Sequence, residues 1–275
     1  MEHPVPPPTA VCYRRVGELE LFADVYFSDE TNSSPRPAML FFHGRGLVEY
    51  TRKHISPYLI QAFLLRGWAA ISVDYRLLPQ VNGLDILDDI QAAWKWIHNE
   101  LPAAIPSLRI DADRILVAGQ SAGGYLAYLL AAREQISETG SPPPRALLVL
   151  YGIHSFSHPF LNTGTQITKY PVPVELLDPF LSSSALVTTG SKDSMKAMVP
   201  SYSDDGQIIE GVDLSGVDLP PTLPPTRGDL YDHFVKESLF PTVLGEDLRL
   251  DPMLEVGPNY PPTVLIHGTA DRVVP

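Results

Sequence analysis

Residues 114–124 read Arg-Ile-Leu-Val-Ala-Gly-Gln-Ser-Ala-Gly-Gly, an apolar stretch that ends in a G-x-S-x-G motif around Ser121. The apolar part predicts a buried strand, and the segment 122–133 predicts a helix. A turn this sharp strains the backbone of its central residue, and glycines flank it because larger side chains would collide with the strand and the helix. The turn would lift Ser121 Oγ above the carboxyl edge of a sheet, where the positive end of the helix dipole favours a developing anion. Ser121 is therefore the candidate nucleophile.

Strand-like and helix-like segments alternate along the first part of the chain. The strand candidates, of which the later ones are continuous apolar runs, are Val11–Val16, Glu18–Phe27, Ala38–His43, Trp68–Tyr75, Arg114–Gly119 and Ala146–Tyr151. Helices are predicted at Pro57–Leu65, at Ala122–Arg133 and around an apolar stripe from Leu87 to Leu101. This alternation predicts an α/β fold with a mostly parallel, doubly wound sheet.

The segment 157–260 interrupts the alternation. It is rich in Pro, Ser, Thr and Gly, and Pro262–Gly268 then restores a strand. A segment this long inside a compact domain is usually functional or disordered, and we favour a cap inserted over an active site to a partly disordered loop. The predicted division is 1–156 for the first part of the core, 157–260 for the cap and 261–275 for the return to the core.

Two further motifs follow predicted strands. The sequence His43-Gly44-Arg45-Gly46 follows one of them, and a glycine-rich turn beside Ser121 can supply backbone N–H donors to an oxyanion, with Ala122 N–H as a further donor. The alternative is an ordinary strand-to-helix connection. Asp271 follows the last predicted strand, which fits the chain order serine, acid, histidine. A carboxylate there would orient the imidazole of a base, and a surface turn residue is the alternative.

Four segments in this order, HGRG at 43–46, DYRLLP at 74–79, GQSAGG at 119–124 and HGTADRVVP at 267–275, resemble an alpha/beta hydrolase of the hormone-sensitive-lipase and carboxylesterase type. The resemblance covers residues 36–156 and 262–275, and it implies the alpha/beta hydrolase fold. It also implies that the N–H groups of Arg45, Gly46 and Ala122 form an oxyanion hole. Arg45 stands where the family usually has a glycine, and its side chain could contact a substrate carboxylate. The 74–80 stretch, with Gln80 for the usual Glu, would support the oxyanion turn.

The same resemblance implies elements that this sequence does not contain. In that family the catalytic histidine follows the acid after one more strand, but no histidine follows Asp271. The last strand and the closing helix are absent too, so residues 263–267 would form an uncovered sheet edge that invites pairing with a second chain. The histidines that could replace the base are His154 and His158, near the carboxyl edge of the sheet, and His233 in the cap.

Composition excludes several classes of protein. The 275 residues are 44% hydrophobic and carry 20 Lys and Arg against 32 Asp and Glu, a net charge of −12. A globular core is therefore expected, and a nucleic-acid binder is not. Residues 1–10 lack a secretory signal, and no apolar run approaches the ~18 residues of a membrane span. Cys12 is the only cysteine, which excludes an intrachain disulfide. We expect a soluble, cytoplasmic protein without a cofactor or a metal.

These observations predict a serine hydrolase of carboxylic esters (EC 3.1.1 type), in which Ser121 forms an acyl-enzyme that water hydrolyses. Its partner would be a small-molecule ester, and a homo-oligomer could form through the exposed sheet edge. Two alternatives stay open, namely a non-catalytic binding or scaffold protein, because the base is missing, and a peptidase, amidase or lactonase on the same fold. Truncation, loss of activity, or a base supplied by the cap or by a second subunit would each account for the missing histidine.

Overall fold

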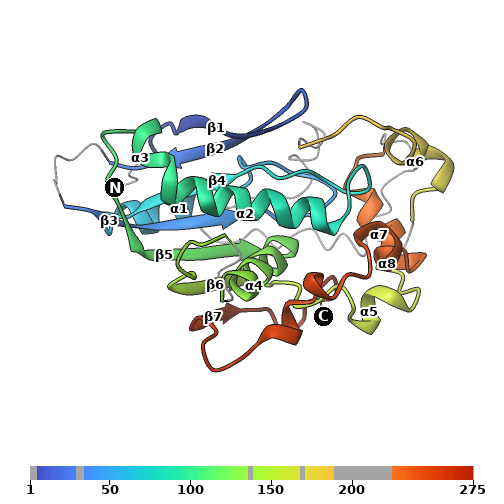
Figure 1. The fold of residues 1–275 in the computed structure, drawn as a ribbon. Coiled ribbons are helices and arrows are strands. Elements are labelled where there is room, and N and C mark those ends of the chain that lie inside the picture. The colour runs from blue at the N-terminus through green and yellow to red at the C-terminus, as the bar shows by residue number, and fades with distance from the viewer. Residues whose placement is uncertain (1–4, 29–33, 136–138, 168–170, 189–224, 275) are drawn as a thin grey trace, which may run out of the picture.

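A seven-stranded sheet forms the centre of the molecule (Figure 1). The computed structural model describes residues 5–28, 34–135, 139–167, 171–188 and 225–274. The strands are β1 (Thr9–Val16), β2 (Leu19–Tyr26), β3 (Arg36–Phe42), β4 (Ala69–Val73), β5 (Ile110–Gln120), β6 (Ala146–Leu150) and β7 (Thr263–Ile266), in the order β1-β2-β4-β3-β5-β6-β7. The pairs β1–β2 and β2–β4 are antiparallel, and the other pairs are parallel. The expected mostly parallel sheet is confirmed.

Helices cover both faces of the sheet, as the alternating side chains of β3 show. Leu40 and Phe42 belong to the larger hydrophobic cluster, which also holds residues of α2 (Gly83–Asn99) and α4 (Ala122–Gln135). Met39 and Phe41 face the opposite side, in a smaller cluster with Ile60 of α1 (Pro57–Leu64). The doubly wound arrangement is therefore confirmed. Within the described residues, no helix has the length and apolar character that crossing a membrane requires.

Helix α2 begins at Gly83, four residues before Leu87, which is the first residue of the apolar stripe that predicts this helix. Its N-terminus lies there because the side chain of Asn82 accepts hydrogen bonds from the N–H groups of Leu84 and Asp85, and Asp85 in turn accepts from Asn82 N. This reciprocal cap satisfies donors that the first turn of a helix leaves unpaired. The helix ends at Asn99, just before the one-turn helix α3 (Leu101–Ala104).

Strand β7 is the edge of the sheet and, within the described residues, it pairs only with β6. Three of its apolar side chains stay exposed: Val264 at 58%, Leu265 at 47% and Ile266 at 56%. These residues are exposed because neither a further strand nor a helix of the described chain covers them. The uncovered edge that the sequence predicts is therefore present in this structure.

Among the described residues, four helices follow β6 and pack at the end of the sheet that carries the serine turn (Figure 1). They are α5 (Pro159–Asn162), α6 (Val174–Leu181), α7 (Asp229–Lys236) and α8 (Phe240–Leu244), and the short 3₁₀ helices Leu248–Leu250 and Pro252–Glu255 follow them. Leu177, Phe234 and Phe240 of these helices belong to the larger hydrophobic cluster of the core. The division into core and cap at 157 and 260 stays a prediction, and residues 189–224 of the predicted cap lie outside the described residues.

Candidate active site

Ser121 lies at the turn between β5 and α4, with φ of 52°. A non-glycine residue in this left-handed region is strained, so the surrounding packing must hold it there. The flanking glycines show how tight that packing is. A Cβ on Gly119 would lie 2.0 Å from the carbonyl oxygen of Gly123, and a Cβ on Gly123 would lie 2.1 Å from the carbonyl oxygen of Phe42. The strand–turn–helix geometry expected of the G-x-S-x-G motif is therefore present, and Ser121 is half-buried at the N-terminus of α4.

The segment 44–48, which we call the 44–48 turn, follows β3 and runs beside Ser121. Its residues Arg45, Gly46 and Leu47 have φ of 72°, 62° and 63°. A Cβ on Gly44 would lie 3.0 Å from Ser121 Cβ, so the two turns are in direct contact. Two sharp turns that follow neighbouring parallel strands thus meet at one edge of the sheet, as the sequence predicts.

Two buried N–H groups in these turns have no acceptor. Among the described residues, neither Gly46 N–H nor Ala122 N–H donates a hydrogen bond, although both residues are buried. A buried N–H without a partner is rare because the loss of its hydration is not offset. An anionic oxygen placed between the two turns is the type of group that such donors would stabilise.

The side chain of Arg45 is engaged within the protein. Its Nε lies 3.1 Å from Oε2 of Glu49, whose side chain is fully buried, and a Cβ on Gly228 would lie 2.3 Å from Arg45 Nε. The guanidinium also lies 5.9 Å from the ring centre of Tyr50. In this structure the charge of Arg45 faces Glu49, and the expectation that this side chain could contact a substrate carboxylate stays a prediction.

The stretch 74–80 holds the 44–48 turn and the residue before it through hydrogen bonds and ring stacking. The hydroxyl of Tyr75 donates to the carbonyl oxygen of His43 at 2.8 Å, and its ring stacks on the imidazole at 4.2 Å. The N–H of Leu78 donates to the carbonyl oxygen of Leu47 at 2.9 Å. Complete burial lowers the pKa of His43 to about 3, so this imidazole is neutral and acts as a packing element.

Asp271 lies on the loop after β7 and is held by its own neighbours. Its Oδ1 accepts from the N–H groups of Val273 and Val274 at 2.9 and 3.0 Å, and its Oδ2 lies 3.3 Å from Nε2 of His267. The sequence predicts that Asp271 would orient a histidine from outside this sequence, whereas the structure places His267 beside it. The spacing of four residues within HGTAD is the signal that could have indicated this pair.

None of the other candidate bases contacts Ser121 in this structure, and two of them have partners elsewhere. The ring of His154 stacks on that of Tyr128, and burial lowers the pKa of His154. His158 Nδ1 accepts from Phe160 N–H and so caps α5. His233 lies on α7. Within the described residues, no imidazole hydrogen-bonds to Ser121 Oγ, so the structure brings the serine and the acid to one sheet edge without a base in contact with the serine.

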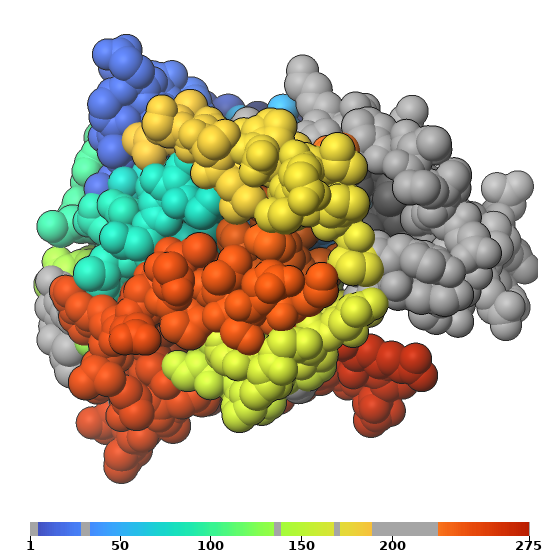
Figure 2. Space-filling view, turned by 90° about the vertical axis from the view of Figure 1, so that its right-hand side faces the viewer, coloured from blue at the N-terminus to red at the C-terminus, as the bar shows by residue number. Residues whose placement is uncertain are grey.

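Helix α7 covers the 44–48 turn, and Figure 2 shows α5 to α8 side by side across this face of the molecule. The ring of Tyr231 packs so closely on Gly46 that a Cβ there would lie 2.3 Å from Tyr231 Cδ2. The Tyr231 hydroxyl reaches the carbonyl oxygen of Val273 at 3.2 Å. Tyr231 therefore touches both the 44–48 turn and the loop that carries Asp271. The sequence marks Tyr231 only as one of several aromatic residues in the predicted cap, and it does not predict these two contacts, because Tyr231 lies far from both segments in the chain.

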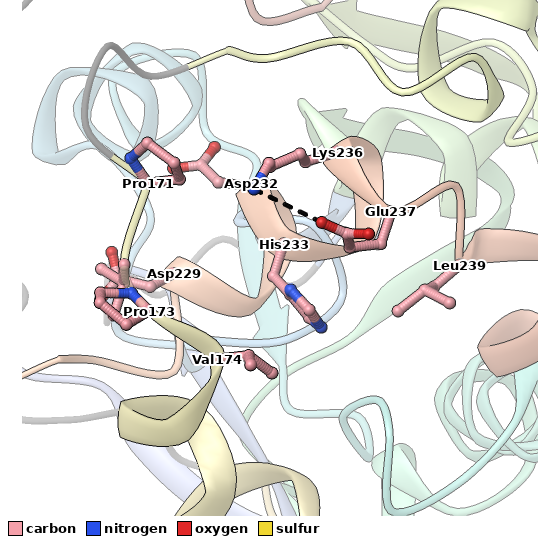
Figure 3. A pocket seen from close by; sticks show the side chains of 10 residues that line it. Pro171, Pro173, Val174, Asp229, Asp232, His233, Lys236, Glu237 and Leu239 are labelled. Atoms are coloured by element: carbon pink, nitrogen blue, oxygen red, sulfur yellow. Dashed lines mark ion pairs between the residues drawn. The ribbon is translucent and has the colours of Figure 1, made fainter.

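The outer side of α7 borders a cavity of about 500 Å³ (Figure 3). Its walls are Pro171–Val174, Leu239 and the α7 side chains Asp229, Asp232, His233 and Lys236, with Glu237 at the end of the helix. Burial raises the pKa of Asp232 to about 6, and the nearby Arg45 opposes this shift. Ser121 does not line this cavity, so the cavity is separate from the meeting point of the two turns.

Two kinds of comparison connect the sequence with known proteins. A family model described as alpha/beta hydrolase fold matches residues 39–222. The non-reducing polyketide synthase Preu6 of Preussia isomera is 30% identical over 96% of this chain, and pkbA of Emericella nidulans is 28% identical over 97%. A third relative, Preu3 of Preussia isomera, is 38% identical over 52% of the chain. The chain spans only 12%, 12% and 6% of the length of these three proteins.

Solved structures share the fold. A protein of unknown function from Staphylococcus aureus subsp. aureus Mu50 superposes with a TM-score of 0.65 at 18% identity, covering 97% of this chain and 81% of that one. Thermogutta terrifontis esterase 2 phosphonylated by sarin gives a TM-score of 0.59 at 18% identity, with 98% and 76% covered. At these identities the likeness shows the fold alone.

Proposed function

The chain belongs to the alpha/beta hydrolase fold family, and from this premise we propose that it is a serine hydrolase that cleaves an acyl ester or thioester through a covalent intermediate on Ser121. One observation carries the proposal. The strained backbone of Ser121 lies beside two buried N–H groups, on Gly46 and Ala122, that have no acceptor among the described residues. A strained nucleophile next to unpaired donors is the arrangement that acyl transfer needs.

In the proposed reaction, Ser121 Oγ forms a bond to the acyl carbon while a base takes the serine proton, and the carbonyl electron pair moves onto oxygen. The N–H groups of Arg45, Gly46 and Ala122 stabilise that oxyanion. The oxyanion then collapses, the bond to the alcohol or thiol breaks, and the leaving group takes the proton from the base. Water attacks the acyl-enzyme in the same way and releases the acid and free Ser121.

Asp271 is the proposed acid, which orients the imidazole of the base. His267 is the first imidazole to test, because its Nε2 lies 3.3 Å from Asp271 Oδ2. An imidazole from outside the described residues is the alternative. Replacing His267 with glutamine distinguishes the two sources, since it removes the base in the first case and leaves it in the second.

The relatives support a proposal for the chemical class of the acyl group. Preu3, Preu6 and pkbA are non-reducing polyketide synthases, and this chain matches a small part of each. A polyketide is an acyl chain rich in carbonyl groups. We therefore extend the proposed ester substrate to polyketide-type acyl esters and thioesters, whose acyl bond this chain would hydrolyse.

The test is intact-mass spectrometry after treatment with a fluorophosphonate, which modifies serines that a base activates. We expect one adduct on the wild type and none on Ser121→Ala. Hydrolysis of p-nitrophenyl butyrate and of an acetoacetyl N-acetylcysteamine thioester should disappear in the same variant. Turnover that survives in Ser121→Ala would refute the assigned nucleophile.

A second candidate function is a non-catalytic binding module, and one observation favours it: no imidazole among the described residues hydrogen-bonds to Ser121 Oγ. This function predicts no adduct and no turnover, together with equal binding of a non-hydrolysable acyl analogue by the wild type and Ser121→Ala. A p-nitroanilide substrate in the same assay tests the amidase alternative.

A further inference from the structure

Arg227, just before α7, connects the cap helices to the 44–48 turn through a buried guanidinium. Arg227 is only 5% exposed. Its Nε donates to the carbonyl oxygen of Val48 at 2.9 Å, and its Nη2 donates to the carbonyl oxygen of Leu78 at 2.5 Å and to Oε1 of Gln80 at 2.7 Å. One side chain thus holds the end of the 44–48 turn and the loop that follows β4.

The burial of this cation is unusual because its partners are neutral. Among the described residues, no carboxylate lies within ion-pair distance of Arg227, although Glu49 is close enough to favour its charged form. Burial lowers the pKa of Arg227 to about 10, so the side chain still carries its charge at neutral pH. A buried charge without an ion-pair partner is unfavourable unless hydrogen bonds compensate for the lost hydration. The three hydrogen bonds to Val48, Leu78 and Gln80 provide that compensation, so the arginine fixes three acceptors that an apolar side chain of similar size would leave unpaired.

Arg227 contacts the 44–48 turn two residues after Gly46, one of the proposed oxyanion donors. Val48 N–H donates to the carbonyl oxygen of Arg45 at 3.1 Å, which closes the turn. Leu47, between Gly46 and Val48, has φ of 63°, a conformation that a free leucine avoids. Fixing Val48 O and Leu78 O therefore restrains a strained segment at the residues that follow Gly46.

Gln80 extends the same connection to α6. While its Oε1 accepts from Arg227, its Nε2 donates to the carbonyl oxygens of Phe180 and Ser183 at 2.6 and 3.1 Å. Gln80 therefore links the end of α6 to Arg227, and Arg227 links it to the 44–48 turn.

We propose that Arg227 is a positioning residue for acyl transfer at Ser121: its guanidinium holds the 44–48 turn in the conformation in which the N–H groups of Arg45 and Gly46 face the reacting carbonyl oxygen. This inference rests on the proposed function. Arg227 touches no substrate in this role and acts only through the backbone that it fixes. Its loss should affect the transition state more than substrate binding.

The test compares Arg227→Met and Arg227→Ala with Arg133→Met. Arg133 is a matched control, because it is also a buried arginine at 3% exposure, but it lies at the far end of α4 from Ser121 and pairs with Glu255 at 2.9 Å. All variants are assayed at a temperature where circular dichroism shows them folded. The readouts are kcat and KM for p-nitrophenyl butyrate and the rate of fluorophosphonate labelling.

We expect both Arg227 variants to lower kcat by about 10- to 100-fold with KM within about threefold, as for a displaced oxyanion donor. Guanidinium at millimolar concentration should restore part of the kcat of Arg227→Ala, and Arg133→Met should keep its kcat within about threefold. A lower Tm with unchanged kcat, or an equal loss of kcat in Arg133→Met, would overturn the positioning role alone. A wild type without Ser121-dependent turnover would overturn the proposed function, and the inference with it.

Discussion

Replacing Gly46 with alanine tests whether helix α7 holds the 44–48 turn in place. The new Cβ would lie 2.3 Å from Cδ2 and 2.8 Å from Cγ of Tyr231, far inside van der Waals contact. Two costs add up. The φ of 62° costs an alanine about 1–2 kcal/mol, and displacing a packed ring costs about 1–3 kcal/mol. We therefore expect the free energy of unfolding to fall by about 2–5 kcal/mol.

A double-mutant cycle with Tyr231→Ala separates these two costs. Tyr231 is 7% exposed, so its truncation alone should cost about 3–5 kcal/mol. In the double variant the clash is gone and only the backbone strain remains. The double variant should therefore be about 1–3 kcal/mol more stable than the sum of the single effects predicts.

The assay is urea unfolding followed by the fluorescence of the buried Trp94 and Trp96. Additivity within about 0.5 kcal/mol would refute the contact between Gly46 and Tyr231. Gly46→Ala should also lower kcat by at least ~10-fold if the 44–48 turn supplies the oxyanion donors.

Three further predictions concern strain, charge and the sheet edge. Ser121→Gly should raise the free energy of unfolding by about 1 kcal/mol because glycine accepts φ of 52° without strain. Equal urea midpoints for Ser121→Gly and Ser121→Ala would show that the backbone of Ser121 is not strained. The pKa of Asp232 rises on folding from 3.8 to about 6, so the folded protein loses stability as the pH rises through that range. Asp232→Asn should therefore stabilise the protein by ~1–3 kcal/mol more at pH 8 than at pH 4. A pH-independent effect of this substitution would show that the carboxyl is not desolvated. Val264 on β7 is 58% exposed, and Val264→Lys should weaken any concentration-dependent self-association through this strand. A wild type that stays monomeric at high concentration in sedimentation velocity would refute pairing at this edge.

Local sequence patterns predict most of the core. The apolar runs of β3 to β6 predict strands, and the periodicity of α2 predicts a helix, because the period and the length of an apolar pattern distinguish the two. The G-x-S-x-G motif adds the geometry of Ser121, because only a sharp turn between a strand and a helix requires glycines at both flanking positions. The 44–48 turn follows from the same logic, since parallel strands bring the segments after their carboxyl ends to one edge.

The contacts that complete the site are long-range and leave no such signal. The packing of Tyr231 on Gly46 and the hydrogen bond from Arg227 to Val48 join segments that are far apart in the sequence. The apolar residues Leu230, Tyr231, Phe234 and Val235 have helical spacing, which places Tyr231 on the buried face of α7 without indicating what that face contacts. Arg227 belongs to no periodic or motif-like segment, so composition and spacing do not distinguish it from a surface residue. The pairing of Arg45 with Glu49 is local, but it lies in a turn with three consecutive positive φ angles, and of these three residues only Gly46 favours such a conformation by its residue type.

Features that oppose folding are concentrated where the two turns meet. Ser121, Arg45 and Leu47 have positive φ, two buried N–H groups lack acceptors among the described residues, and Arg227 is buried against neutral partners.

The nearby structural arginines are built differently. Arg52 pairs with Asp24 and Asp74 at 2.7 and 2.6 Å, and Arg76 pairs with Asp89 at 2.8 Å. A chain selected only for stability would satisfy its donors and charges at the turns as it does at Arg52 and Arg76. Local violations that the rest of the fold must stabilise are expected at functional sites, and this contrast supports the proposed site at Ser121 and the 44–48 turn.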